Sequence, residues 1–343
     1  MIVCVKIRNY FFFYKNRVPT QDDRIVLYLQ NLKDKMKQLY ILFALCIMTG
    51  ASAACNTRSR SGAHEDNTLY RMIDSIAAKY DATVGVAVII NGKDTVTYNG
   101  NIRYPMMSVF KFHQALAVLG FLQKNGIPAD TMLHISKAEL RPDTYSPLRD
   151  RYPEGNIDLP IATLLEYTLQ LSDNNACDIL FDRIVGIPET DSHIRSLGVT
   201  DFSIAVNEEE MHADPESCRL NWSTPLATAG LTELFITGKA LSGEYFRYMK
   251  ETMFRCNTGT GRLPHPLKGT GAAIGHKTGT SDQAPNGRYY GINDIGFVLL
   301  DSGDRYSIAV FVTDSGETLE TTEHLIAEIS AAVLQHITGN KTN

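Results

Sequence analysis

Three short segments, far apart in the chain, carry side chains that together could transfer an acyl group. In the first, Ser108 and Lys111 are three positions apart, so they share a face of any helix that contains them. A serine hydroxyl is a weak nucleophile until a neighbouring base accepts its proton, and a desolvated lysine can be that base. Pro105 favours a helix start here, which would aim free backbone N–H groups at developing negative charge. The pair alone decides nothing, because about one Ser-x-x-Lys is expected by chance in a chain of this length.

The second segment is Ser172-Asp173-Asn174, between helices predicted at 161–171 and 176–185. Ser172 could pass a proton to a leaving group, and the Asn174 amide could hydrogen-bond a substrate carbonyl. Asp173 is expected to fix the turn through backbone hydrogen bonds. The alternative is that the segment is only a helix N-cap rich in Asp and Asn.

The third segment is Lys277-Thr278-Gly279-Thr280, near the start of a C-terminal pair of strands. Lys277 would supply positive charge for an anionic substrate, and Gly279 would let a ligand approach the strand backbone closely. Strict alternation sends Lys277 and Thr278 to opposite faces, so a twisted or irregular strand is predicted if both face one site. The alternative is an edge-strand lysine that hinders aggregation.

The elements that must position these segments come from both ends of the chain. In chain order they are a helix at 68–80, strands at 84–90 and 95–98 joined by an Asn-Gly turn, strands at 291–300 and 306–313, and a helix at 321–337. The middle, 105–255, is predicted to be helices broken by polar loops. The fold class is therefore α+β, an antiparallel sheet with flanking N- and C-terminal helices and an inserted all-helical lobe. The sheet lobe would be 68–104 with 256–338, and a cleft beside the helical lobe is the natural place for a site.

The N-terminal part predicts export. Residues 39–48 form an apolar run, preceded by three lysines and followed by small residues, which is typical of a secretory signal and short for a membrane span. Met36 is then the expected true start, so that 1–35 is a non-native or unusual extension and 36–54 is the signal. Residues 55–67 would be a flexible tether before a catalytic domain at 68–338. A periplasmic location follows.

Cys55 leaves a second outcome of export open. It follows small residues, as the lipidated cysteine of a bacterial lipoprotein does, so membrane anchoring through Cys55 is one alternative. Three further cysteines, Cys177, Cys218 and Cys256, lie in the body of the chain, and three thiols cannot all pair internally. We interpret them as buried small residues, with a Cys177–Cys218 disulfide as the alternative. Their spacing suggests no metal site.

Composition limits the classes of function. The chain has 343 residues with 44% hydrophobic and 21% charged residues, as in ordinary globular proteins. Lys plus Arg total 33 against 38 Asp plus Glu, a net charge of −5, which argues against nucleic-acid binding.

Taken together and in this order, the three segments resemble the S-x-x-K, S-D-N and K-T-G motifs of class A β-lactamases and penicillin-binding proteins. The resemblance extends over about 67–337. It implies a β-lactamase/transpeptidase-like fold and hydrolysis of β-lactam antibiotics through a serine acyl-enzyme, with cephalosporinase activity. A monomer without metal or organic cofactor is expected, acting on a small-molecule β-lactam.

A further motif bears on how the acyl-enzyme would be hydrolysed. Within a polar stretch at 207–221, Glu208 is followed three residues later by Met211 and then by His212. This is similar to the omega-loop motif of the cephalosporinase-like, extended-spectrum branch of class A, in which the glutamate orients the deacylating water. His212 would replace the usual asparagine. Three other glutamates are competing candidates for this role: Glu209, Glu210 and Glu216. The alternative is that the whole stretch is a solvated charged loop.

The resemblance also assigns roles to residues around the cleft. Backbone N–H groups of Ser108 and Thr280 would form the oxyanion hole. The proton of Ser108 would pass to Lys111, or to Glu208 through water, and Ser172 would protonate the ring nitrogen. Lys277, Thr278 and Thr280 would meet the substrate carboxylate.

Four further positions are assigned more loosely by the same resemblance. Arg262 either assists in binding the substrate carboxylate or is a surface charge. Tyr145 is either an aromatic gatekeeper at the rim or a loop tyrosine packed on proline. Asp178 and Asn221 match positions that tie the loop to the helical lobe.

Three rival functions remain at this point. A D,D-peptidase would keep the three motifs but lack the Glu208 loop. A serine glutaminase shares the fold and the S-x-x-K motif, and a non-catalytic periplasmic protein is the third alternative.

Overall fold

The structure is a computed structural model of the chain that describes residues 68–339. The predicted extension, signal and tether at 1–67, with Cys55, lie outside the described residues. Among the residues that are described, no helix combines the length and apolarity needed to cross a bilayer.

A five-stranded antiparallel sheet forms the centre of the sheet lobe, in the order β2-β1-β10-β9-β8. The inner strands have long apolar runs rather than alternation, because both faces of the sheet are covered. Asn91 and Gly92, at the predicted turn, have φ of +54° and +69°. β1 pairs with β2 and β9 pairs with β10, so both predicted strand pairs are confirmed. The strands are β1 (Thr83–Ile90), β2 (Asp94–Tyr98), β8 (Ala273–Thr280), β9 (Ile292–Leu299) and β10 (Arg305–Thr313).

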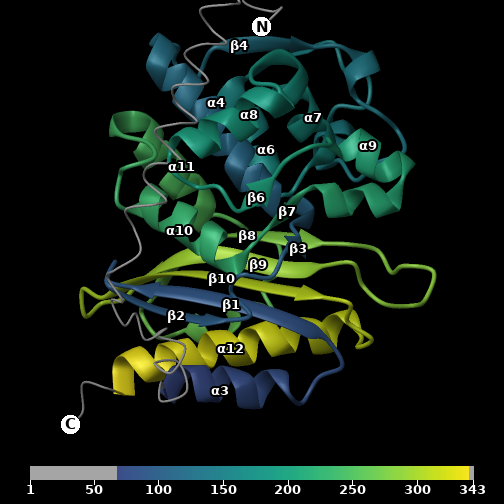
Figure 1. Cartoon of the computed structure of the whole chain (residues 1–343). Helices are drawn as coiled ribbons and strands as arrows, with labels where there is room; N and C mark the ends of the chain where they lie inside the picture. The colour runs from purple at the N-terminus through teal and green to yellow at the C-terminus, as the bar shows by residue number, and fades with distance from the viewer. Residues whose placement is uncertain (1–67, 340–343) are drawn as a thin grey trace, which may run out of the picture. The chain divides into compact units, whose positions relative to one another are not determined.

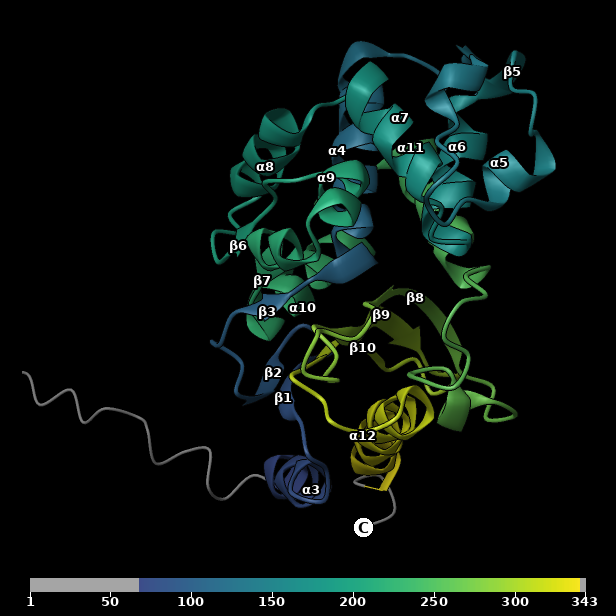
Figure 2. The same cartoon turned by 90° about the vertical axis from the view of Figure 1, so that its right-hand side faces the viewer.

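Two terminal helices, α3 (Thr68–Ala77) and α12 (Leu319–Gly339), cover one face of the sheet, as Figures 1 and 2 show. Leu69 and Ile73 of α3 are fully buried at helical spacing, as the sequence pattern predicted. Successive strand residues contribute to opposite faces: Val86 and Val88 pack with the terminal helices, whereas Ala87 packs with the helical part. The predicted flanking helices are confirmed.

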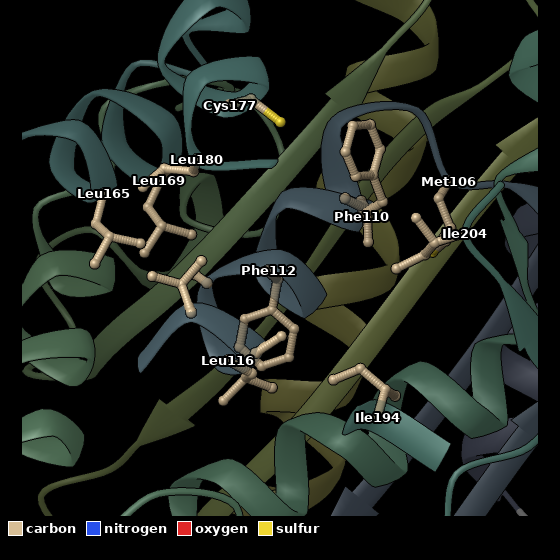
Figure 3. Packing of buried hydrophobic residues seen from close by; sticks show 14 of the residues in the cluster. Met106, Phe110, Phe112, Leu116, Leu165, Leu169, Cys177, Leu180, Ile194 and Ile204 are labelled. Atoms are coloured by element: carbon tan, nitrogen blue, oxygen red, sulfur yellow. The ribbon is translucent and has the colours of Figure 1, made fainter. Parts of the chain in front are cut away.

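The inserted helical part, predicted at 105–255, covers the other face of the sheet. Its central helix, α4, is buried on nearly every side, so Phe110, Phe112 and Leu116 all contribute to the core (Figure 3). The helices here are α4 (Phe110–Asn125), α5 (Pro147–Arg151), α6 (Ile161–Gln170), α7 (Asn174–Arg183), α8 (Ile187–Ser196), α9 (Glu208–Ala213), α10 (Pro225–Ile236) and α11 (Gly243–Phe254).

The inserted part is not purely helical, which corrects one detail of the prediction. A two-stranded and a three-stranded sheet lie in or beside it. Strands of two to four residues are too short to produce a periodic hydrophobic pattern, so the sequence gives no signal for them. The remaining short elements are β3 (Tyr104–Pro105), β4 (Met132–Ile135), β5 (Ile157–Pro160), β6 (Phe202–Ser203), β7 (Trp222–Ser223), η2 (Met107–Val109), η3 (Lys137–Glu139), η4 (Pro215–Leu220) and η5 (His265–Leu267).

The described cysteines are all free thiols. Cys177 and Cys218 are buried, and Cys256 is partly exposed. The interpretation as buried small residues is confirmed for Cys177 and Cys218 and is wrong for Cys256, and the alternative of a disulfide between Cys177 and Cys218 is wrong.

Candidate active site

A cavity of about 800 Å³ lies where the helical part meets β8. Its wall takes residues from all three motifs and from the stretch at 207–221. The predicted site residues that line it are Ser108, Tyr145, Ser172, Asn174, Glu208, Thr278 and Thr280. His212 also lines it. The segments that the sequence places far apart therefore converge on one cavity.

Ser108 is presented by the short helix η2, directly before α4. Met107, just before it, has a φ of +47°, a left-handed conformation that is uncommon for a residue with a side chain. Strand β8 runs very close to this turn. A Cβ on Gly279 would lie 2.5 Å from the Met106 carbonyl oxygen and 3.3 Å from the Ser108 backbone nitrogen. A glycine is therefore needed here because of space.

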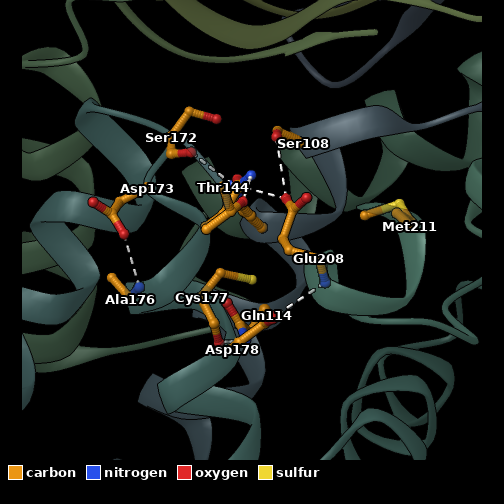
Figure 4. A network of polar contacts seen from close by, with 12 residues as sticks. Ser108, Gln114, Thr144, Ser172, Asp173, Ala176, Cys177, Asp178, Glu208 and Met211 are labelled. Carbon is orange, nitrogen blue, oxygen red and sulfur yellow. Dashed lines mark hydrogen bonds and ion pairs between the residues drawn. The ribbon is translucent and has the colours of Figure 1, made fainter. Parts of the chain in front are cut away.

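Glu208 and Lys111 lie beside the Ser108 hydroxyl. Ser108 Oγ donates to Glu208 Oε1 at 3.3 Å (Figure 4). Lys111 Nζ lies 2.8 Å from the same oxygen. Lys111 Nζ also donates to the Ser172 carbonyl and to Asn174 Oδ1, both at 2.7 Å. Burial lowers the pKa of Lys111, but the charge of Glu208 opposes this and the net pKa is raised. Lys111 is therefore an ammonium at neutral pH.

The Ser172-Asp173-Asn174 segment is held rigidly at the start of α7. Asp173 is fully buried and accepts hydrogen bonds from the backbone nitrogens of Ala176 at 2.8 Å and Leu148 at 2.6 Å. Its predicted role in fixing the turn is confirmed. Ser172 has a φ of +59°, so this rigid turn holds it in an uncommon conformation beside the cavity.

Lys277 reaches the same region from β8. Its Nζ donates to Ser172 Oγ at 3.0 Å and to the Thr278 carbonyl at 2.7 Å. Burial, and then the charge of Lys111, lower the pKa of Lys277 to about 7. β8 pairs with β9 without interruption from Ala273 to Thr280. Of Lys277 and Thr278, Thr278 lines the cavity, whereas Lys277 lies behind the wall, so the condition for the predicted twisted or irregular strand is not met. The long lysine side chain brings the amine to Ser172, which does line the cavity.

The chain is similar to known proteins in both sequence and structure. Residues 68–337 match the model of the β-lactamase enzyme family. The chain belongs to this family. A β-lactamase of Bacteroides uniformis is 38% identical over 277 residues, covering 79% of this chain and 92% of that one. The crystal structure of the TLA-1 extended-spectrum β-lactamase is 41% identical with a TM-score of 0.76, covering 79% of this chain and 99% of that one. A class A β-lactamase from Bacteroides cellulosilyticus is 38% identical with a TM-score of 0.76, covering 79% and 97%.

This chain is thus a class A β-lactamase, of the branch that includes TLA-1, and its activity is the hydrolysis of β-lactams. The predicted α+β fold class, the enzyme class and the family are confirmed. The rival peptidase, glutaminase and non-catalytic functions fit these matches less well.

Four glutamates of this β-lactamase were candidates for the base that activates the deacylating water. Of these four, only Glu208 lines the cavity. Glu209 pairs with Arg141 at 2.6 Å, and Glu210 closes the capping box of α9. Glu216 accepts from the Tyr290 hydroxyl at 2.6 Å. The structure therefore places Glu209, Glu210 and Glu216 away from the cavity lining, which contradicts their candidacy for this role.

Asp178 and Asn221 tie the two ends of the stretch that carries Glu208. Asp178 accepts from the backbone nitrogens of Glu208 at 2.9 Å and Glu209 at 3.0 Å. Burial, with a smaller contribution from the Glu208 charge, raises the pKa of Asp178 to about 7. Asn221 accepts from the backbone nitrogen of Val206 at 3.1 Å and donates to its carbonyl at 2.8 Å. Both contacts fit the expected anchoring role.

Arg262 is not a surface charge, which corrects one of its two interpretations. Its side chain is buried behind β8, with 2% of the residue exposed. One guanidinium nitrogen donates to the Gly279 and Asn293 carbonyls at 3.1 and 2.8 Å, and the other donates to Thr280 Oγ1 at 2.7 Å. Arg262 therefore reaches the cavity only through the Thr280 hydroxyl.

The rim contains residues that the sequence did not single out. Thr258 lines the cavity and shares a 2.7 Å hydrogen bond with Thr278 through their hydroxyl groups. Thr144 also lines it and accepts from Asn174 Nδ2 at 2.9 Å. Tyr145 is 59% exposed at the same rim, a position that suits a gatekeeper. Isolated threonines in loops have no pattern by which a sequence could reveal them.

Proposed function

We propose that this β-lactamase opens β-lactams with Ser108 as the nucleophile and releases the product with Glu208 as the base for water. The observation that carries this proposal is the Glu208 carboxylate, which contacts both the Ser108 hydroxyl and the Lys111 ammonium. One carboxylate can thereby serve both halves of the reaction.

In the first half, Glu208 accepts the Ser108 proton as Ser108 attacks the lactam carbonyl. The raised pKa of Lys111 favours Glu208 over Lys111 as the acceptor, because an ammonium has no free lone pair. The Lys111 charge then stabilises the alkoxide that forms. The backbone N–H groups of Ser108 and Thr280 stabilise the oxyanion, which is consistent with the close approach of β8 at Gly279.

The ring nitrogen must take up a proton when the lactam opens. Ser172 is the proposed donor, because its hydroxyl is hydrogen-bonded by Lys277 Nζ. An amine whose pKa is about 7 can resupply that proton at neutral pH. Lys277 and Ser172 thus form the proposed path to the leaving nitrogen.

Before the second half, Glu208 returns the Ser108 proton to solvent and Lys277 regains a proton from solvent. The Glu208 carboxylate then activates a water that hydrolyses the ester on Ser108. The two backbone hydrogen bonds to Asp178 fix the first residues of α9, and this fixed backbone keeps the carboxylate in place. Lys277, Thr278 and Thr280 bind the substrate carboxylate, with Arg262 orienting the Thr280 hydroxyl. His212 and Tyr145 line the wall beside the variable side chain of the substrate.

Cephalosporins, including those with large side chains, are the proposed substrates. The size of the cavity and the similarity to an enzyme named extended-spectrum support this. We further propose that the chain is exported to the periplasm and acts there as a monomer. Lipid anchoring through Cys55 remains the alternative to a freely diffusing form, and the intact mass of the mature protein distinguishes the two.

A chromogenic cephalosporin tests the proposal directly. The unmodified enzyme should turn over many equivalents, whereas Ser108→Ala should turn over none, with an unchanged circular-dichroism spectrum as the control for folding. A single stoichiometric burst from the unmodified enzyme would indicate a penicillin-binding protein instead. Sustained turnover by Ser108→Ala would refute the assignment of the nucleophile.

A further inference from the structure

Behind the Thr278 side of the cavity lies a group of three side chains that the hydrolytic mechanism does not use. His276 on β8 places its Nδ1 3.0 and 3.1 Å from the two carboxylate oxygens of Asp294 on β9. The thiol of Cys256, which follows α11, lies close enough to this imidazole for the two charges to shift each other's pKa. His276 is 2% exposed and Asp294 is fully buried, whereas Cys256 is partly exposed. The arrangement of thiol, imidazole and carboxylate is one that activates a sulfur nucleophile.

Charge favours the thiolate in this group. Burial raises the pKa of Cys256, but the charge of His276 and, to a smaller extent, that of Lys277 lower the net pKa. Burial also lowers the pKa of His276, yet Asp294 and Cys256 oppose this and raise it to about 10. The group therefore keeps the imidazolium at neutral pH and favours the thiolate more than an isolated cysteine does.

The other two described cysteines lack such partners. Burial raises the pKa of Cys177 well above its usual value and that of Cys218 to about 11. Neither side chain is exposed. Both thiols should therefore react slowly with electrophiles, which makes them internal references for Cys256.

The Cys256 sulfur is connected to the cavity wall by a short chain of contacts. Its Sγ lies 3.4 Å from Thr258 Oγ1, which in turn lies 2.7 Å from Thr278 Oγ1. Both threonines line the cavity. The segment has little room to yield, because a Cβ on Gly259 would lie 2.5 Å from the Thr278 methyl carbon. A group added to the sulfur therefore meets Thr258 directly, and a shift of Thr258 would move the wall at Thr278.

We propose that Cys256 is a modification site for small disulfides and thiosulfonates, and that its adduct weakens β-lactam binding through Thr258 and Thr278. In the reaction with methyl methanethiosulfonate, the Cys256 thiolate attacks the divalent sulfur of the reagent. A new S–S bond forms, the bond between the two reagent sulfurs breaks, and methanesulfinate leaves with the electron pair. The proton that began on the thiol stays on His276 until solvent removes it. A thiol reductant reverses the modification.

The test treats the full chain with methyl methanethiosulfonate at neutral pH and follows each cysteine-containing peptide by mass spectrometry. Because a thiol of ordinary pKa is only a few per cent ionised at neutral pH, Cys256 should react at least about tenfold faster than Cys177 and Cys218. The kcat/KM for a chromogenic cephalosporin should fall about tenfold in parallel, mainly through KM, and recover with dithiothreitol.

Two variants make the test specific. Cys256→Ser should keep its turnover and lose the sensitivity to the reagent, with thermal melting as the check on folding. His276→Asn should slow the labelling of Cys256 about tenfold, which a merely structural histidine would not do. Equal labelling rates for the three cysteines, or labelling of Cys256 without a change in KM, would overturn the proposal. The KM effect rests on the proposed function, but the labelling rates do not, so failure of one is distinguishable from failure of the other.

Discussion

Replacing Gly279 by alanine is expected to remove most of the activity while leaving the fold intact. The added Cβ would lie 2.5 Å from the Met106 carbonyl oxygen, whereas ordinary contacts of a Cβ begin near 3.4 Å. Strand β8 must therefore retreat from the Ser108 turn by about 1 Å, at a cost of about 1–3 kcal/mol in the free energy of unfolding. A misplacement of about 1 Å in a reacting geometry lowers rates about 100-fold.

The assay for Gly279→Ala is pre-steady-state acylation by a chromogenic cephalosporin, with thermal melting alongside. The matched control is Gly230→Ala, because a Cβ on Gly230 in α10 meets nothing within 4 Å. That variant should keep its acylation rate and gain up to about 1 kcal/mol, since alanine is the better helix former. If Gly279→Ala acylates within about threefold of the unmodified enzyme, the close approach of β8 to Ser108 is not needed for catalysis.

Three further predictions concern the groups around the cavity. Asp178→Ala should lower the free energy of unfolding by about 2–4 kcal/mol, because two backbone N–H groups of α9 lose their acceptor. Acylation and deacylation should both slow, because Glu208 serves both steps, and unchanged rates would argue against anchoring of Glu208. The pKa of Lys277, about 7, predicts that kcat/KM for an anionic β-lactam falls as pH rises above about 7, because the ammonium loses its proton; a flat profile between about pH 6 and about pH 9 would contradict this. Arg262→Lys should raise KM several-fold, because a lysine cannot hydrogen-bond Thr280 and the strand carbonyls together. An unchanged KM would show that Arg262 does not assist in binding the substrate carboxylate.

The sequence allowed the architecture to be predicted wherever its pattern is periodic. The helices at each end and both hairpin pairs have strong apolar patterns, and the structure contains them within a few residues of the expected bounds. The two-residue strands β3, β6 and β7 could not be predicted, because a pattern needs several repeats to be visible.

The sequence allowed most residues of the site to be predicted, but not how their side chains are arranged in space. The pairing of Ser108 with Lys111 follows from helical spacing alone, whereas the approach of Lys277 and Glu208 depended on a family resemblance. The reach of the Lys277 side chain from a regular strand, and the burial of Arg262 behind β8, depend on tertiary packing that no local pattern records.

The choice among clustered glutamates illustrates the same limit. Glu208, Glu209 and Glu210 are adjacent in sequence, yet they point to the cavity, to Arg141 and to the cap of α9 respectively. A helix turns by about 100° per residue, so neighbours in a short helix face different surroundings. Only the direction in which α9 docks decides which of them meets Ser108.

The most direct measurement of the central claim is the intact mass of Glu208→Ala after mixing with a cephalosporin. Without the Glu208 charge, burial lowers the pKa of Lys111, so its amine can accept the Ser108 proton and acylation continues. If Glu208 activates the water that hydrolyses the ester, the variant should then accumulate a stable adduct on Ser108 and release product at least about 1,000-fold more slowly. Glu209→Ala, altered at the neighbouring position, should show no adduct and near-normal turnover. Turnover by Glu208→Ala at the rate of the unmodified enzyme, with no adduct, would contradict the account.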